Sequence, residues 1–140
     1  MSKPKAHLQS CALPFAWEDG DLCLGITTCY RGKNWRFPKV SINESQCPVD
    51  AASNIALSEG GFVGLISEES LANVETAKGG KVQFFPLEIS GLLEDWEGER
   101  HHRRKLVPLS RIEKYVSDRS LLRVVKKLVE DHLGLELTGN

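Results

Sequence analysis

The alternation of apolar and polar positions predicts a β-hairpin near the start of the chain. Apolar residues dominate positions 11–17 and again positions 22–30. Between these runs, Asp19-Gly20 supplies residues that tolerate the positive φ angles of a tight primed turn. We therefore expect two antiparallel strands joined by this turn, followed by a basic loop.

The middle of the chain predicts one helix and two strands. Residues 48–59 have helical spacing, with Pro48 at a first helical position, where a missing N–H costs nothing, and Gly60-Gly61 as a stop. Residues 62–66 are typical of a short buried strand. The clearest strand is 81–89, in which Pro86 indicates an edge or a bulge. The intervening segment is polar and ends in a turn at Gly79-Gly80, and a further short strand is expected at 106–109.

The C-terminal part predicts an amphipathic helix. A short helical stretch is expected at 110–116, Asp118 is the expected N-cap and Gly134 the expected stop. A single apolar stripe contains Leu121, Val124, Val125, Leu128, Val129 and Leu133. Strands interrupted by one helix and closed by another predict an α/β (α+β) fold, a mixed sheet with helices on both faces. We expect one domain over residues 10–134, between polar tails at 1–9 and 135–140.

Composition limits the classes of function. The chain has 140 residues, of which 41% are hydrophobic, which suffices for one core. Eighteen basic and nineteen acidic residues give a net charge of −1, so no global field attracts a nucleic acid duplex or a membrane. The N-terminus lacks the apolar segment of a signal peptide, and no apolar window is long enough to span a membrane. We expect a cytoplasmic protein in which any site for a polyanion is local.

The four cysteines do not predict a metal site or a disulfide. They form no C-x-x-C pair and no zinc pattern with the histidines. Cys23 and Cys29 lie on one predicted strand, roughly 20 Å apart at ~3.3 Å per residue, which is too far for a bridge. Reduced thiols are expected.

The segment from Val40 to Gly61 resembles the Nudix box, the metal-and-diphosphate motif of Nudix hydrolases. That pattern is Gly, five residues, Glu, seven residues, then Arg-Glu-apolar-any-Glu-Glu-any-Gly-apolar, and the segment fits it without insertion or deletion. The pattern's glycine, first Glu, Arg, next Glu and Glu pair fall on Val40, Gln46, Asn54, Ile55, Ser58 and Glu59. Only Glu59 and Gly61 retain the expected residue among the polar and glycine positions.

A second stretch extends the resemblance over residues 11–129. Residues 81–89, the Leu93-Glu94-Asp95-Trp96-Glu97 segment and the basic run 100–105 are similar to a section of diphosphoinositol polyphosphate phosphohydrolases. Residues 35–39, Trp-Arg-Phe-Pro-Lys, resemble the entry to their box. The resemblance implies an α/β/α sandwich with a mixed β-sheet between helices. It also implies cleavage of inositol pyrophosphates or dinucleoside polyphosphates with Mg²⁺ or Mn²⁺.

The remaining carboxylates define the candidate metal site. Ile55, Ser58 and Glu59 are three and four residues apart on a helix and so share one face. With a single carboxylate there, Mg²⁺ or Mn²⁺ would be weakly bound if at all. Glu94 and Glu97 are the candidate replacement ligands that could join the catalytic candidate Glu59. On the helix alone, the competing interpretation is a packing element whose Glu59 is simply solvated.

The basic run predicts the phosphate contacts. The resemblance places Arg103, Arg104 and Lys105 on a segment that faces phosphate, where Arg36 and Lys39 could complete a cradle. Runs of charge are often only solvated, and the acidic residues just before this run could neutralise it.

Three hypotheses follow for function. The favoured one is a Nudix-like domain that binds a phosphorylated small molecule of the nucleoside-diphosphate-X or inositol-pyrophosphate class, with metal-dependent hydrolysis weakened or lost. The first alternative is an active diphosphate hydrolase with relocated carboxylate ligands. The second is a non-catalytic protein-interaction or regulatory module, since a fold does not fix a function. The sequence leaves the oligomeric state open.

Overall fold

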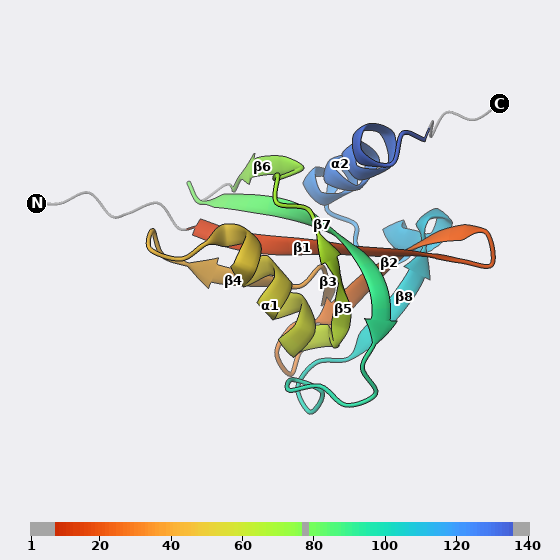
Figure 1. Ribbon diagram of the computed structural model, residues 1–140, viewed down its shortest axis with the longest axis horizontal. Coiled ribbons are helices and arrows are strands. Elements are labelled where there is room, and N and C mark those ends of the chain that lie inside the picture. Colours follow the sequence, from red (N-terminus) through yellow and green to blue (C-terminus); the bar gives the residue numbers. More distant parts are fainter. Residues whose placement is uncertain (1–7, 77–78, 136–140) are drawn as a thin grey trace, which may run out of the picture.

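A mixed β-sheet organises the chain in the computed structural model, which describes residues 8–76 and 79–135 (Figure 1). Over these residues the sheet contains eight strands: β1 (Leu8–Glu18), β2 (Asp21–Thr28), β3 (Trp35–Arg36), β4 (Lys39–Ile42), β5 (Phe62–Ile66), β6 (Ala72–Glu75), β7 (Lys81–Leu92) and β8 (Arg104–Pro108). The helical elements are α1 (Pro48–Gly60), the 3-10 helix η1 (Leu109–Lys114), α2 (Arg119–Lys127) and the π-helical turn η2 (Leu128–His132). Among the described residues, no helix is long and apolar enough to cross a membrane.

The long strand β1 lies at the centre of the sheet. On one side it pairs in parallel with β7, from Leu8 opposite Lys81 to Phe15 opposite Glu88. On its other side it pairs antiparallel with β4 near its start and with β2 near its end. Strand β7 pairs on its outer side with β6 and then with β5, while β2 also pairs with β3 and β8.

The predicted hairpin is confirmed. Strands β1 and β2 pair antiparallel up to Glu18 opposite Asp21. The two residues between them have positive φ angles, 50° at Asp19 and 84° at Gly20. This is the conformation that a two-residue primed turn requires, and glycine adopts it without steric cost.

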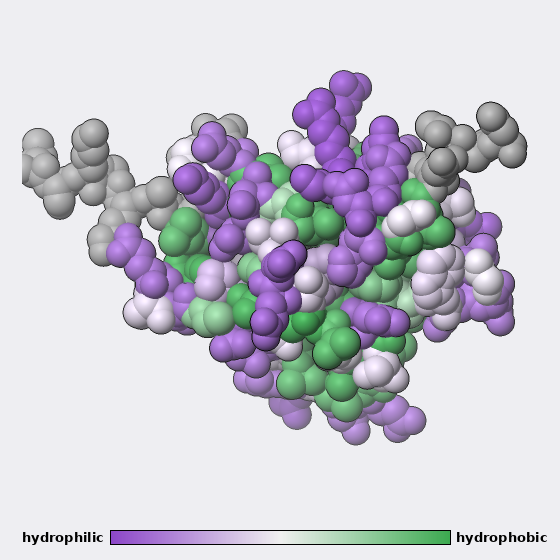
Figure 2. Space-filling model, turned by 45° about the horizontal axis from the view of Figure 1, so that its top comes forward, coloured by the Kyte–Doolittle hydropathy of each residue, from purple (hydrophilic) through white to green (hydrophobic). Residues whose placement is uncertain are grey.

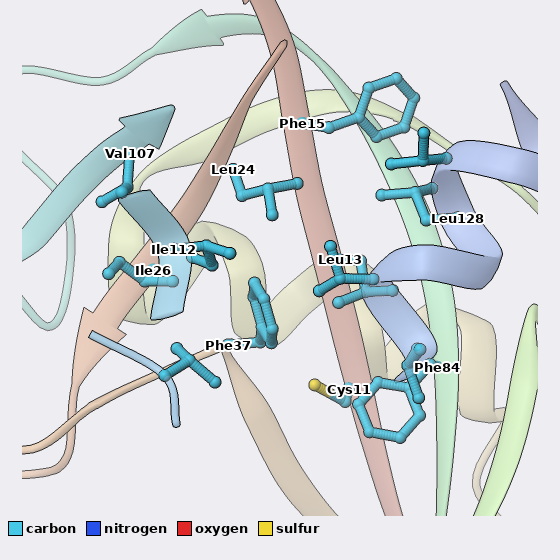
Figure 3. Packing of buried hydrophobic residues seen from close by; sticks show 14 of the residues in the cluster. Cys11, Leu13, Phe15, Leu24, Ile26, Phe37, Phe84, Val107, Ile112 and Leu128 are labelled. Carbon is cyan, nitrogen blue, oxygen red and sulfur yellow. The ribbon is translucent and has the colours of Figure 1, made fainter. Parts of the chain in front are cut away.

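Helices cover both faces of the sheet, so the predicted sandwich is confirmed. Because side chains alternate along a strand, Ala12 faces a cluster with Ala52 and Ala56 of α1. Its neighbours Cys11 and Leu13 face the opposite way, into a larger cluster (Figure 3). That second cluster receives Leu24 and Ile26 from β2, Phe84 from β7, Ile112 from η1 and Leu128 from the C-terminal helix.

The predicted helix 48–59 is confirmed as α1. Pro48 occupies its first turn, and Gly61 ends it in the left-handed conformation with φ 63°, where its N–H bonds to the carbonyl of Leu57. This ending directs the chain straight into β5. The last turn of α1 therefore lies against the sheet rather than in solvent.

The C-terminal helix also follows the prediction. Asp118 is the N-cap of α2, and its side chain accepts a hydrogen bond of 2.8 Å from the N–H of Ser120. Four members of the apolar stripe are buried: Val124, Val125, Leu128 and Val129. The stretch expected to be helical at 110–116 forms the 3-10 helix η1, and Gly134 has φ 67°. All four cysteines are free, as expected.

Three expectations for the middle of the chain were wrong. Strand β5 is not buried along its length, because Leu65 remains 77% exposed. The polar segment after it contains a strand, β6, which pairs with β7. Pro86 lies inside the sheet rather than at an edge or at a bulge: it is opposite Leu13 of β1, and the register shift occurs beside Gly64.

Pro86 is tolerated in this central strand because of a gap on the outer side of β7. Its carbonyl accepts the N–H of Ser67, so its nitrogen points to the same side. There β5 ends at Ile66 and β6 begins at Ala72. No strand faces the proline nitrogen within the described residues, and the missing N–H leaves no ladder bond unmade.

Candidate functional site around Glu59

The last turn of α1 places the carboxylate of Glu59 inside the protein. Glu59 is 6% exposed. Its Oε1 accepts a hydrogen bond of 2.9 Å from Arg36 Nη2, and its Oε2 accepts one of 3.2 Å from Thr27 Oγ1. The expectation of a simply solvated Glu59 was wrong, because an ion pair and a hydroxyl satisfy this carboxylate from β3 and β2.

The partner of Glu59 is the cation that the sequence assigned to a phosphate cradle. Arg36 lies on the two-residue strand β3 and keeps 26% of its side chain exposed. Its Nη2 contacts Glu59, and its Nε is buried without a hydrogen-bond partner among the described residues. The guanidinium therefore supplies the positive charge beside the one carboxylate that the box retains.

The other box positions bring no second carboxylate to this point. Ile55 and Ser58 are half-buried on α1, and Asn54 is exposed. Gln46 is exposed in the preceding loop, where its side-chain oxygen accepts the N–H of Asn43. Val40, at the glycine position, lies in regular pairing opposite Ser10 of β1. A side chain at position 40 is thus accommodated by an ordinary β-strand.

The candidate replacement ligands lie in the connection between β7 and β8. Glu94 and Glu97 are both exposed there, while Glu59 is buried. Within the part of the chain that the structure describes, no three His, Cys, Asp or Glu side chains form a group that could hold a metal ion. The three carboxylates Glu59, Glu94 and Glu97 are therefore not gathered into one site.

The basic run divides between the two faces of β8. Arg104 points toward α1, where its Nη1 donates hydrogen bonds to the carbonyls of Gly60 at 2.9 Å and Leu93 at 2.6 Å. Its guanidinium also lies 4.2 Å from the ring centre of Trp96. Burial lowers the pKa of Arg104 from its ordinary value. Arg104 thus ties the end of α1 to the β7–β8 connection.

Arg103 and Lys105 are exposed and lie over aromatic rings on the opposite side of β8. The Arg103 guanidinium is 5.4 Å from the ring centre of Trp35. The Lys105 ammonium is 6.0 Å from the same ring and 5.0 Å from that of Tyr115. We call these four residues, Trp35, Arg103, Lys105 and Tyr115, the aromatic-basic cluster.

Lys39 is half-buried on β4, opposite Cys11 of β1. Burial is the main cause that raises the pKa of the Cys11 thiol, against the smaller opposing effects of Lys39 and Arg36. Arg36 and Arg104 point toward α1, away from the aromatic-basic cluster. The five predicted phosphate contacts therefore do not line one surface.

Sequence reasoning missed two polar residues at the end of β2. Thr27 is fully buried and donates to Glu59, and the carbonyl of Thr28 lies 2.7 Å from Nδ1 of the buried His102. The sequence does contain an indication of them, because two threonines follow one another at the end of a mostly apolar strand. Buried polar groups need partners, so such a pair indicates that polar side chains arrive from elsewhere in the chain.

Comparisons with known proteins identify the fold. No family model and no curated protein matches the sequence. The structure is similar to the NUDIX domain of Shewanella oneidensis NrtR, solved with ADP ribose. The TM-score is 0.74 at 16% sequence identity, and the match covers 91% of this chain and 89% of that one. It is also similar to a binary complex of the C. elegans Ap4A hydrolase: TM-score 0.75, 14% identity, 91% of this chain and 99% of that one. A NUDIX hydrolase from Nitrosomonas europaea gives TM-score 0.73 at 16% identity, over 95% of this chain and 76% of that one.

These similarities establish that the chain has the Nudix fold. Each covers nearly all of this chain, so the similarity extends to the whole α/β/α arrangement. At such low identity the likeness extends to the fold and not to the reaction. The particular resemblance to diphosphoinositol polyphosphate phosphohydrolases stays a prediction.

Proposed function

We propose that this Nudix-fold domain binds a phosphorylated small molecule that contains a diphosphate, and hydrolyses it weakly or not at all. The pairing of Glu59 with Arg36 and Thr27 is the observation that supports the proposal. Metal-assisted hydrolysis needs an ion that activates water and neutralises the charge developing on phosphate. Here a guanidinium already neutralises the single carboxylate at the box positions.

Arg36 acts against a divalent ion in two ways. It occupies Oε1 of Glu59, which is a hard oxygen that Mg²⁺ or Mn²⁺ would otherwise use. It also places a positive charge beside any ion that approached Oε2, and like charges repel strongly where water is largely excluded. Ile55 and Ser58 offer no compensating negative charge. We therefore infer that metal binding is too weak to support efficient turnover.

The aromatic-basic cluster supports the binding part of the proposal. Arg103 and Lys105 are exposed cations that could bond to phosphate oxygens, and the faces of Trp35 and Tyr115 hold both in place. The named ligand of one structural neighbour, ADP ribose, and the Ap4A of another contain diphosphate groups. We extend to this chain the nucleoside-diphosphate-X or inositol-pyrophosphate class. The cytoplasmic location that suits such a ligand is a prediction.

The catalytic part is tested by phosphate release from ADP ribose, diadenosine tetraphosphate and an inositol pyrophosphate, with Mg²⁺ or Mn²⁺. We expect at most slow release, and no further loss in Glu59→Gln. Rapid, ion-dependent cleavage that Glu59→Gln abolishes would overturn the proposal and favour an active hydrolase with relocated ligands. Purification of wild type and variant in parallel controls for a contaminating enzyme.

The binding part is tested by thermal stabilisation with the same ligands in the absence of metal. We expect an increase in melting temperature that falls as salt rises and is lost in the double variant Arg103→Ala with Lys105→Ala. The matched control is Arg123→Ala with Lys126→Ala, which removes two exposed cations from α2 and keeps the effect. If no ligand stabilises the wild type, a protein-interaction module becomes the better explanation.

The role of Arg36 is tested by rebuilding the box. The triple variant Asn54→Arg, Ile55→Glu, Ser58→Glu restores the family residues around Glu59. We expect Mn²⁺ to raise its melting temperature only when Arg36→Gln is added, because the guanidinium then no longer competes. Equal metal binding with and without Arg36→Gln would show that Arg36 is not the obstacle.

A further inference from the structure

Strand β5 is a sheet edge without the usual protection against pairing. It pairs with β7 and, within the described part of the chain, with no other strand. Its five residues, Phe-Val-Gly-Leu-Ile, include no charged residue and no proline. The strands that pair with a single neighbour elsewhere in the sheet do carry charge: Arg36 on β3, Lys39 on β4, Glu75 on β6 and Lys105 on β8. Edge charges discourage pairing between molecules, and β5 has none.

The exposed side chains of β5 are apolar. Leu65 is 77% exposed and Val63 is 39% exposed, on the face of the strand opposite to Phe62, which packs on α1. Leu93, just after β7 and bonded to Gly61, is 39% exposed, while Leu92 lies opposite Phe62 and belongs to the other face. Figure 2 shows apolar side chains gathered at the surface toward the lower centre of that view. Val63 and Leu65 are therefore neighbouring exposed apolar side chains on one face of an edge strand, a combination that favours contact with another chain.

Among the described residues, no strand pairs with the outer side of β5, so its outward-facing backbone groups are open to pairing. The carbonyl of Gly61 accepts the N–H of Leu93, and the N–H of Ser67 donates to Pro86, so positions 61 and 67 face β7. Because these groups alternate along a strand, Phe62, Gly64 and Ile66 face away from β7. The register shift beside Gly64 adds a residue to β7 and leaves the alternation of β5 intact.

We propose that β5 pairs antiparallel with β5 of a second copy of this chain, about a two-fold axis at Gly64. In this register the outward-facing groups of Gly64 bond to Gly64 of the second copy, and those of Phe62 bond to Ile66 of the second copy. Val63 then lies opposite Leu65 of the second copy, and Leu65 opposite its Val63. These are non-hydrogen-bonded pairs, in which side chains approach most closely.

The strand is complementary to itself in this register, which favours a second copy over an unrelated strand. Rotation about the axis exchanges the two apolar side chains, so each exposed residue contacts the other, as an isologous interface requires. The axis falls on the one residue of β5 without a side chain, and no like charges meet. Pairing at a sheet edge also fixes the register through the alternation of side chains.

The register predicts a charge-swap experiment on the full chain, read as molar mass by light scattering over a concentration series. The wild type is expected to form dimers of about twice 15.6 kDa. Val63→Lys and Leu65→Glu are each expected to be monomeric, since a charge would face an apolar side chain. Mixing the two variants restores a dimer, and so does the double variant, because the introduced lysine of one copy then faces the introduced glutamate of the other.

The control is Leu135→Lys, which places the same charge at an exposed leucine elsewhere and leaves the dimer unchanged. A second readout is oxidation of the double variant Val63→Cys with Leu65→Cys in a Cys47→Ser background. It should link two chains, because facing residues ~4.5 Å apart at Cα suit a disulfide. A monomeric wild type, a dimer that survives both single variants, or variants that do not recombine would each overturn the proposal. A monomer that captures an added strand peptide would instead indicate pairing with another protein.

Discussion

The two faces of the sheet near β3 and β8 hold their cations differently. On the α1 face, Arg36 is paired with Glu59, and Arg104 donates to the carbonyls of Gly60 and Leu93. On the other face, Arg103 and Lys105 lie exposed over Trp35. Cations that the sequence grouped into one phosphate cradle therefore have different surroundings: Arg36 and Arg104 are bonded to groups of the protein, whereas Arg103 and Lys105 are exposed.

Among these cations, the removal of Arg36 should reduce stability the most. We expect Arg36→Met to reduce the free energy of unfolding by about 3 kcal/mol, because it leaves the buried carboxylate of Glu59 without its charge partner. Urea denaturation followed by circular dichroism measures the change. Glu59→Gln is the control, since it keeps hydrogen bonds to both neighbours and should cost less. A loss below about 0.5 kcal/mol for Arg36→Met would mean that the pair does not hold the fold.

Removing Arg104 should have the next largest effect. Arg104→Met loses two hydrogen bonds from a charged donor and the contact with Trp96, for an expected cost of about 2 kcal/mol. The same denaturation experiment measures it. Arg103→Met is the matched control, one position away on the exposed face. Equal costs for the two variants would contradict the assignment of different roles to these neighbours.

The buried thiol of Cys11, on the face of the sheet opposite to α1, predicts a pH dependence. Burial raises the pKa of Cys11, so the folded protein keeps this proton when the unfolded chain releases it. The folded state then binds more protons, and stability falls as pH rises above the ordinary thiol pKa. Relative to Cys11→Ala, the wild type should lose about 1 kcal/mol between pH 8 and 9.5. Urea denaturation of both proteins at each pH measures the difference. If the free energy of unfolding of the two proteins falls equally with pH, the prediction is wrong.

The smallest effect on stability is expected on the exposed face. Arg103→Met with Lys105→Met should change the free energy of unfolding by no more than about 0.5 kcal/mol, because both side chains are exposed. The same variant should lose the stabilisation by a diphosphate ligand. Loss of stability together with binding would show that the aromatic-basic cluster maintains the fold as well. Unchanged binding of the ligand would show that the aromatic-basic cluster is not part of the ligand site.

Signals that are local in sequence predicted the elements well. The Asp19-Gly20 turn, Pro48 and Gly61 at the ends of α1, and Asp118 as an N-cap each depend on a few neighbouring residues. Strand β6 was missed because its alternating sequence, Ala-Asn-Val-Glu, is only four residues long with one β-branched residue, and it is extended by pairing with β7. Pro86 was misplaced because the gap between β5 and β6 exists only in three dimensions.

The candidate site was less predictable because its contacts join distant positions. The box frame located Glu59 on α1, but its partner Arg36 is 23 residues away on strand β3. The resemblance placed Arg103, Arg104 and Lys105 on one phosphate-facing segment, and the strand itself was expected to begin only at residue 106. It begins at Arg104, so alternation sends Arg104 to one face and Lys105 to the other. The start of a single strand thus decides which cations can meet a phosphate.

The parallel ladder between β1 and β7 governs how the chain acquires its structure. Residues 8–15 must find residues 81–88, and the intervening chain must close a long loop before this pairing stabilises anything. Such non-local pairing raises the contact order and slows folding. During synthesis the hairpin emerges first and leaves one side of β1 unsatisfied until β7 leaves the ribosome. We therefore expect the nascent chain to be prone to aggregation until β7 has been made.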